Sequence, residues 1–217
     1  MASLKDIPNV TLLALDVTKI QDIKTAKEAV SSQTDGRLSC LVNNAARNHF
    51  MPFLDDDIDA AKRMFETNVW APLAVTQAFA PLLIETQGAL VNITSIAGHG
   101  PVPTLEQIAE VFRLDLAPFN VKRLYVVTGA VPTNGQSYFE DWALPSGSLY
   151  KPVEKIMASV VRATNGMARM PRVEYANTVV DTILASTTGR IWMGGRAQEA
   201  KMLQLREKVL RLGTIWS

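Results

Sequence analysis

The sequence lacks most of the features that would place the protein in a membrane, outside the cell or on nucleic acid. Its single cysteine, Cys40, cannot form an internal disulfide, which is typical of a reducing compartment. The 22 lysines and arginines nearly balance the 21 aspartates and glutamates, so no charge excess favours nucleic acid or anionic lipid. The sequence starts without an apolar signal-peptide core, and no apolar run is long enough to cross a bilayer. We therefore expect a cytoplasmic protein with no membrane span and no nucleic-acid partner.

Metal-binding patterns, repeats and linkers are also missing. No cluster of histidine, cysteine and aspartate has the spacing of metal ligands, so we expect no metal. The chain shows no internal repeat and no low-complexity stretch, and its 217 residues suffice for one domain with a buried core. These absences predict a single domain over residues 1–217.

What is present is an alternation of strand-like and helix-like patterns. Apolar, β-branched segments predict strands at 10–18, 38–45, 88–95, 121–129 and 189–195. Apolar residues at helical spacing predict helices at 22–32, 57–87, 105–116, 152–164, 172–187 and 196–217, the last an amphipathic C-terminal helix. Pro72 is expected to mark a bend in the long helix. The alternation predicts a three-layer α/β/α fold with a mostly parallel sheet.

Four short motifs follow one another in a specific order. They are LDVT at 15–18, LVNNA at 41–45, NVWAP at 68–72 and VNITSIAG at 91–98. With them the chain resembles the short-chain dehydrogenase/reductase family from about residue 9 to 195. The stretch 113–134, followed by GRIWMGG, is similar to its fungal acyl-dihydroxyacetone-phosphate-reductase-like branch. The resemblance implies a Rossmann-like fold.

The first departure from the family concerns the cofactor. Family members begin with a strand and a TGxxxGIG turn that binds the cofactor pyrophosphate at a helix N-terminus. Here the sequence starts just before what would be the third strand of the family, and no GxxxGxG occurs. We therefore expect a truncated Rossmann-like sheet of about five strands, with 10–18 placed beside 38–45 by a right-handed crossover. Exchange of that strand between two subunits is the alternative.

The second departure concerns catalysis. The family places YxxxK after the serine strand, and the resemblance implies that this tyrosine supplies a proton while the lysine lowers its pKa and holds the ribose. Here Thr104 runs directly into Leu105, and no tyrosine is followed by lysine four residues later. Hydride transfer needs a bound nicotinamide and a proton donor. We therefore expect no cofactor and no redox catalysis.

Three residues are candidates for catalysis. Ser95 and Asn68 match two of the four catalytic positions that the resemblance implies. His99 lies four residues after Ser95, between two glycines, and histidine can move a proton near neutral pH without a cofactor. Each has a structural alternative: a turn serine, an asparagine bonded to backbone, and a solvated loop histidine. His49 is a further candidate at the same rim.

The substrate contacts are expected in a lid-like loop at 133–150. Its aromatic side chains Tyr138, Phe139 and Trp142 can close over an apolar ligand, or they can cover the core. Asn44 follows a strand and is a further substrate-contact candidate, although tying neighbouring loops together is its structural alternative.

Three functions remain open. The first is a cofactor-independent cyclase, isomerase or dehydratase acting on an apolar, polyketide-like specialised metabolite in the vacated cofactor and substrate cleft. The second is a catalytically inactive subunit or binding partner of an intact reductase, and the third is an NADPH-dependent reductase with residual activity. A decayed copy or an incomplete gene model is the alternative without any function. The family commonly dimerises through helices equivalent to 57–87 and 105–116, so a homodimer is expected, although the second helix is shortened.

Overall fold

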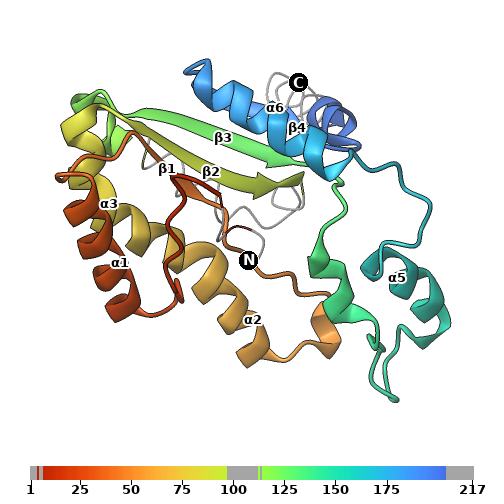
Figure 1. Cartoon of the computed structure of the whole chain (residues 1–217). Helices are drawn as coiled ribbons and strands as arrows, with labels where there is room; N and C mark the ends of the chain where they lie inside the picture. The colour runs from red at the N-terminus through yellow and green to blue at the C-terminus, as the bar shows by residue number, and fades with distance from the viewer. Residues whose placement is uncertain (1–3, 5–6, 97–111, 113, 204–217) are drawn as a thin grey trace, which may run out of the picture.

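A parallel sheet with helices on both faces forms the centre of the molecule (Figure 1). The computed structural model describes residue 4 and residues 7–96, 112 and 114–203. Within them the strands are β1 (Cys40–Asn43), β2 (Ala89–Ser95), β3 (Lys122–Thr128) and β4 (Gly189–Met193). All three neighbouring pairs are parallel, and the order in the sheet is β1-β2-β3-β4. The predicted Rossmann-like α/β class is confirmed.

The helices also lie where helical spacing predicts them. The α-helices are α1 (Ile20–Gln33), α2 (Ile58–Phe65), α3 (Ala71–Thr86), α5 (Glu154–Val161) and α6 (Arg172–Leu184). The 3₁₀ segments are η2 (Phe53–Asp55), η5 (Ala117–Phe119), η6 (Asn134–Phe139) and η7 (Lys151–Val153). Residues 197–203 are helical, and the rest of the expected C-terminal helix lies outside the described residues. The same holds for most of the helix expected at 105–116.

The two faces of the sheet are covered by different helices. Side chains alternate along a strand, so Leu90 and Val91 point to opposite faces, and both are fully buried. The Leu90 face packs against α3 and Leu116, whereas the Val91 face packs against α6. The crossovers β1–α3–β2 and β3–α6–β4 both move one strand along the sheet in the same direction. Their helices cover opposite faces, so the two crossovers have opposite handedness. Only one of them can follow the right-handed rule.

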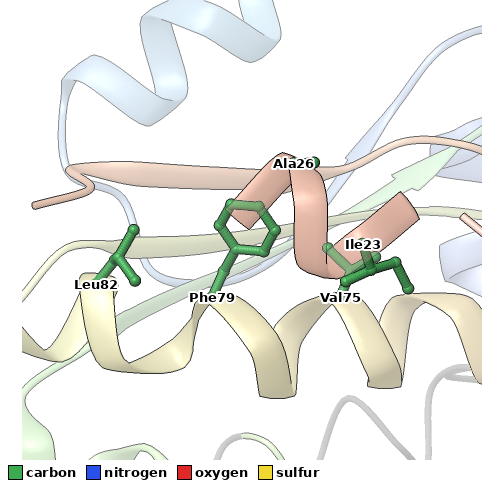
Figure 2. Close-up of a cluster of buried hydrophobic side chains, with 5 residues drawn as sticks. All are labelled: Ile23, Ala26, Val75, Phe79 and Leu82. Carbon is green, nitrogen blue, oxygen red and sulfur yellow. The ribbon is translucent and has the colours of Figure 1, made fainter. Parts of the chain in front are cut away.

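A buried cluster fixes α1 against α3 (Figure 2). Ile23 and Ala26 of α1 meet Val75, Phe79 and Leu82 of α3. All five side chains are at most 6% exposed, and burial of a large apolar side chain stabilises by about 1.5–3 kcal/mol. The cluster holds α3 in place, and Thr76 of α3 accepts a hydrogen bond from Asn43 at the carboxyl end of β1.

The long helix predicted at 57–87 contains a π-helical turn. The turn η3 (Glu66–Trp70) joins α2 to α3, and Ala71 N donates to Glu66 O, five residues back. Pro72 follows immediately and has no N–H to donate to the carbonyl of Asn68, so it disfavours a regular α-helical turn there. The irregularity expected at Pro72 therefore falls one turn earlier and centres on Asn68. Such π turns are frequent at functional sites.

The strand predicted at 10–18 does not form. Residues 10–16 have no regular secondary structure, so that prediction was wrong, and the described sheet has four strands rather than about five. Leu15 and Val17 line a cavity together with residues of β1, and Val17 packs in the same cluster as Leu41, but the segment forms no ladder with β1. Asp16 then turns the chain into α1, because its Oδ1 accepts hydrogen bonds from N and Oγ1 of Thr18. The apolar side chains of this segment stay 37–41% exposed: Val10, Leu12, Leu13 and Leu15.

Length and composition alone would let one described helical stretch, Ile58–Thr86, cross a bilayer. Half of its most apolar window is buried inside the fold, where α3 packs on α1 and β2. This is the environment of a core helix, and it offers only weak evidence for a membrane span.

Candidate functional site

Polar side chains gather at the carboxyl ends of the strands, the edge where ligands bind in open α/β sheets. Asn43 ends β1, Ser95 ends β2 and Thr128 ends β3. The register pairs Ser95 with Thr128, and paired residues on neighbouring strands point to the same face. Because Val91 and Ser95 are four residues apart, that face is the one covered by α6.

Tyr175 joins this pair from the first turn of α6. Its hydroxyl lies 2.6 Å from Thr128 Oγ1, and its ring packs in the cluster around Val91 and Val126. Burial raises the pKa of the Tyr175 phenol, and the hydrogen bond with Thr128 acts in the opposite direction. We call Ser95, Thr128 and Tyr175 the hydroxyl cluster.

A second polar group ties β1, β2 and α3 together. Asn43 Nδ2 donates to Asn92 Oδ1 at 2.9 Å and to Thr76 Oγ1 at 3.0 Å. Asn92 is 1% exposed, and its Nδ2 has no hydrogen-bond partner among the residues that the structure describes. The group fixes the carboxyl end of β1 relative to Ser95 on β2.

Replacing Asn43 with alanine is expected to lower the free energy of unfolding by about 1–3 kcal/mol, because buried Asn92 and Thr76 lose their partner. Urea unfolding followed by circular dichroism measures the change. The exposed neighbour Asn44→Ala is the matched control, expected within about 0.5 kcal/mol of the original chain. Equal midpoints for the two variants would contradict this role.

Asn68 holds the loop after β1. Its Oδ1 accepts from Arg47 N and its Nδ2 donates to Arg47 O, both at 2.8 Å. Both contacts are structural hydrogen bonds to backbone, which is the alternative to a catalytic role for Asn68. The amide therefore positions the rim of the site.

Of the two candidate histidines, the structure describes only His49. His49 Nε2 lies 2.5 Å from Asp56 Oδ1, and both side chains are largely buried. This pair joins the loop after β1 to the start of α2. His99 lies outside the described residues.

The lid-like loop 133–150 is irregular, as expected, and it contacts the loop after β1. Trp142 Nε1 donates to Phe50 O, and the rings of Phe139 and Phe50 meet edge to face at 5.1 Å. The orange segment near residue 50 and the green segment near residue 139 lie side by side (Figure 1). Tyr138, by contrast, is 83% exposed and faces solvent. Of the three predicted aromatic contacts, two therefore hold the loops together.

The far end of the lid-like loop is fixed by charged groups. Glu154 Oε1 accepts from Lys151 Nζ at 2.8 Å and from Leu144 N at 2.7 Å. The Lys151 hydrogen bond, followed by the one from Leu144, holds the pKa of Glu154 below its usual range. Ser148 Oγ donates to Asp55 Oδ2, which links this end to η2.

Acid is expected to release this end of the loop. The lowered pKa of Glu154 means that its contribution is present above the ordinary glutamate range and is lost as the pH falls through the lowered value. The protection factor of the Leu144 amide against hydrogen exchange should fall in that window. Glu154→Gln should remove the pH dependence of this protection. An unchanged pH profile in that variant would show that another group controls the loop.

Two cavities lie beside the sheet. One, of about 200 Å³, borders the outer edge of β1 and α3, and Asn44 is among its lining residues. Most of its lining is apolar: Leu15, Val17, Leu41, Val42, Ala71, Val75 and Phe79. The other, of about 300 Å³, lies at the amino ends of the strands near Ser186, opposite the hydroxyl cluster. No group of three or more metal-ligating side chains occurs in the described part of the chain.

Sequence reasoning missed Thr128 and Tyr175. The search for a tyrosine followed by lysine set Tyr175 aside, and it lies 47 residues from Thr128. The available signal was positional: Thr128 ends the strand expected next to the strand of Ser95, at the ligand-binding edge.

Comparison with known proteins shows the family of this chain. The family model for short chain dehydrogenases matches residues 1–143. The short-chain dehydrogenase PC-15 of Penicillium crustosum is 36% identical over 210 residues, which cover 92% of this chain and 77% of that protein. The short-chain dehydrogenase virD of Hypocrea virens is 34% identical over 207 residues, 90% of this chain and 71% of that protein. The chain belongs to the short-chain dehydrogenase/reductase family.

Solved structures show the same fold. A short-chain dehydrogenase from Streptomyces avermitilis has a TM-score of 0.82 and 24% identity over 98% of this chain and 81% of its own. A Burkholderia cenocepacia short-chain dehydrogenase in complex with NADP has a TM-score of 0.68 and 23% identity, covering 95% of this chain and 78% of its own. At this identity the similarity establishes the architecture alone.

Proposed function

We propose that this short-chain dehydrogenase/reductase has lost nicotinamide-dependent redox catalysis and acts as a cofactor-independent enzyme. The reaction is of the cyclase, isomerase or dehydratase type, in which the protein orients an apolar, polyketide-like substrate and moves protons without net oxidation. One observation carries the proposal. The strand that ends in Ser95 is intact, yet none of the four tyrosines of the 217 residues is followed by lysine four positions later.

The residues at this edge do not fit a nicotinamide dinucleotide. The resemblance would place the Asp16 carboxylate over an adenine, but its Oδ1 accepts from Thr18 and its Oδ2 lies 3.3 Å from Lys19 Nζ. The hydrogen bonds from Thr18 lower the pKa of Asp16 below its usual value. The Asn68 amide is likewise bound to Arg47 at both ends. Because the Asp16 and Asn68 side chains are bonded to other residues of the chain, we propose a reaction that uses no nicotinamide cofactor.

The cavity beside β1 is an argument for an apolar substrate. Its lining is mostly aliphatic, and its polar residues are Asn43, Asn44 and Thr67. At about 200 Å³ it is below the roughly 300–1,000 Å³ of pockets that enclose a whole drug-sized ligand. It suits one ring or a short chain of a larger molecule that extends along the carboxyl edge.

Proton transfer without a nicotinamide tests the proposal. The probe is α-tetralone, an apolar bicyclic ketone whose hydrogens next to the carbonyl exchange with D₂O through the enol. We expect the protein to accelerate this exchange, followed by NMR with no nicotinamide present. Ser95→Ala should slow it at least about tenfold, because a hydrogen bond to the developing oxyanion is lost.

The exposed Ser39, at the opposite end of the sheet, supplies the matched control, and Ser39→Ala should leave the exchange rate unchanged. Exchange at the buffer rate, or an equal rate in Ser95→Ala, would count against the proposal. So would reduction of the ketone that depends on NADPH.

A second candidate function is an inactive subunit that pairs with another protein. It is favoured by the outer edge of β1, where Val42 is 45% exposed, and by the exposed apolar segment from Val10 to Leu15. Such surfaces favour protein contacts. Analytical ultracentrifugation separates a homodimer from a monomer, and co-purification with an intact relative would support the pairing.

A further inference from the structure

The hydroxyl cluster has a geometry that the family resemblance does not supply. Ser95 and Thr128 are direct neighbours on two parallel strands, and their side chains share the face covered by α6. Tyr175 reaches Thr128 from that helix at 2.6 Å. The register of β2 and β3 and the contact from α6 therefore bring three hydroxyl-bearing residues to the same region of the carboxyl edge.

The chemistry of the two hydroxyls favours one direction for the hydrogen bond between Tyr175 and Thr128. A phenol is more acidic than an aliphatic alcohol, and its oxygen is the poorer acceptor because its lone pair is shared with the ring. Either hydroxyl can be the donor in this 2.6 Å contact, and these properties favour Tyr175 as the donor and Thr128 Oγ1 as the acceptor. With Tyr175 as the donor, Thr128 directs its own hydrogen away from Tyr175, and a hydroxyl that accepts one hydrogen bond donates a stronger one.

We propose that Thr128 and Tyr175 complete an oxygen-binding site at Ser95 for the carbonyl group of an apolar substrate. Thr128 donates the second hydrogen bond to the carbonyl oxygen beside the one from Ser95. Tyr175 is a positioning residue that fixes the direction of the Thr128 hydroxyl. No bond is made or broken by these three residues, since they bind and polarise the carbonyl. The inference rests on the proposed function and names the substrate class of its site.

The surroundings of the cluster favour an apolar carbonyl compound. Across the sheet Thr128 lies between Ser95 on β2 and Met193 on β4. Ile93, Ile191 and Met193 pack in the same partly buried cluster as Tyr175. The site thus offers hydroxyl donors on one side and aliphatic or thioether groups on the other, which suits a ketone attached to a ring or chain.

Infrared spectroscopy of bound α-tetralone, labelled with ¹³C at the carbonyl, tests the site. Hydrogen bonds from the protein should lower the carbonyl stretching frequency, and Tyr175→Phe or Thr128→Val should each return part of that shift. Both should weaken binding about threefold to tenfold, as expected for one lost hydrogen bond. Thr128→Ser keeps the hydroxyl and should restore both the shift and the affinity to within about twofold, which a purely structural role of Thr128 would not predict.

A measurement without ligand tests the direction of the hydrogen bond. The intensity ratio of the tyrosine Fermi doublet in ultraviolet resonance Raman spectra distinguishes a donating from an accepting phenol. The spectrum of the original chain minus that of Tyr175→Phe isolates Tyr175, and we expect a donor. An accepting phenol or no binding of α-tetralone at millimolar concentration would overturn the inference. So would a carbonyl frequency in Tyr175→Phe equal to that in the original chain.

The two proposals fail in different ways. Tight NADPH binding would overturn the proposed function and would leave the Raman and infrared results on the cluster to be read independently. Deuterium exchange that depends on Ser95 but not on Tyr175 or Thr128 would overturn the inference alone.

Discussion

Replacing Gly129 with alanine is expected to lower the free energy of unfolding by about 3 kcal/mol and to remove ligand binding at Thr128. A Cβ atom at position 129 would overlap the carbonyl oxygen of Gly195, which is backbone and cannot rotate away. The two chains are held there by hydrogen bonds from Gly129 N to Met193 O and from Ala130 N to Gly195 O, both at 2.7 Å. To admit the methyl group, β3 and the segment after β4 must separate.

Gly147 supplies the matched control, because a Cβ there would meet nothing within 4 Å. Gly147→Ala should change stability by less than about 0.5 kcal/mol, and both variants are compared by urea unfolding. If Gly129→Ala unfolds at the same urea concentration as Gly147→Ala, the close approach of the backbones at the end of β3 is not needed for stability.

Phe79→Ala is expected to lower the free energy of unfolding by about 3–5 kcal/mol, the range for removing a large aromatic side chain from a core. Phe79 is 5% exposed and packs between α1 and α3 in the cluster of Figure 2. Alanine is a strong helix former, so the loss would come from packing and from the cavity left behind. Thermal unfolding with and without the change measures it.

Gln77→Ala, an exposed position of the same helix, should change the free energy of unfolding by less than about 0.5 kcal/mol. A loss of less than about 1 kcal/mol for Phe79→Ala would mean that α1 contributes little to the core. In that case the account of how α3 is held beside β1 would be wrong.

Local pattern was enough to predict most of the fold. Alternating strand and helix patterns are set by side chains within one segment, and a parallel sheet follows from short strands joined by helices. The helix over 57–87 was predicted, but its π turn was not placed at Asn68. The proline at 72 removes one donor, and which carbonyl accommodates that loss depends on the neighbouring loop, where Asn68 binds Arg47.

The segment from Val10 to Thr18 shows why pattern alone fails at a sheet edge. Its composition favours a strand, but a strand needs a hydrogen-bonded neighbour, and apolar residues cannot specify which edge is within reach. Here Leu15 lines a cavity together with residues of β1 without joining the sheet, and Asp16 ends the segment in a turn. The exposed apolar side chains are the consequence.

The candidate site was predicted in part. Ser95 lies at the carboxyl edge as expected, because its place at the end of a strand is a local property. Its neighbours Thr128 and Tyr175 depend on the register of β2 against β3 and on which face α6 covers, and neither is encoded locally. The lid aromatics were predicted to contact substrate, whereas Phe139 and Trp142 contact the loop at Phe50. Substrate contact by these residues stays a prediction.

A calorimetric titration with NADPH tests whether this chain has lost nicotinamide chemistry. The relative from Penicillium crustosum serves as the comparison protein, measured under the same conditions. We expect no heat of binding for this chain at millimolar NADPH. A dissociation constant below about 10 μM, near −7 kcal/mol, would contradict it and would assign the protein to the reductases.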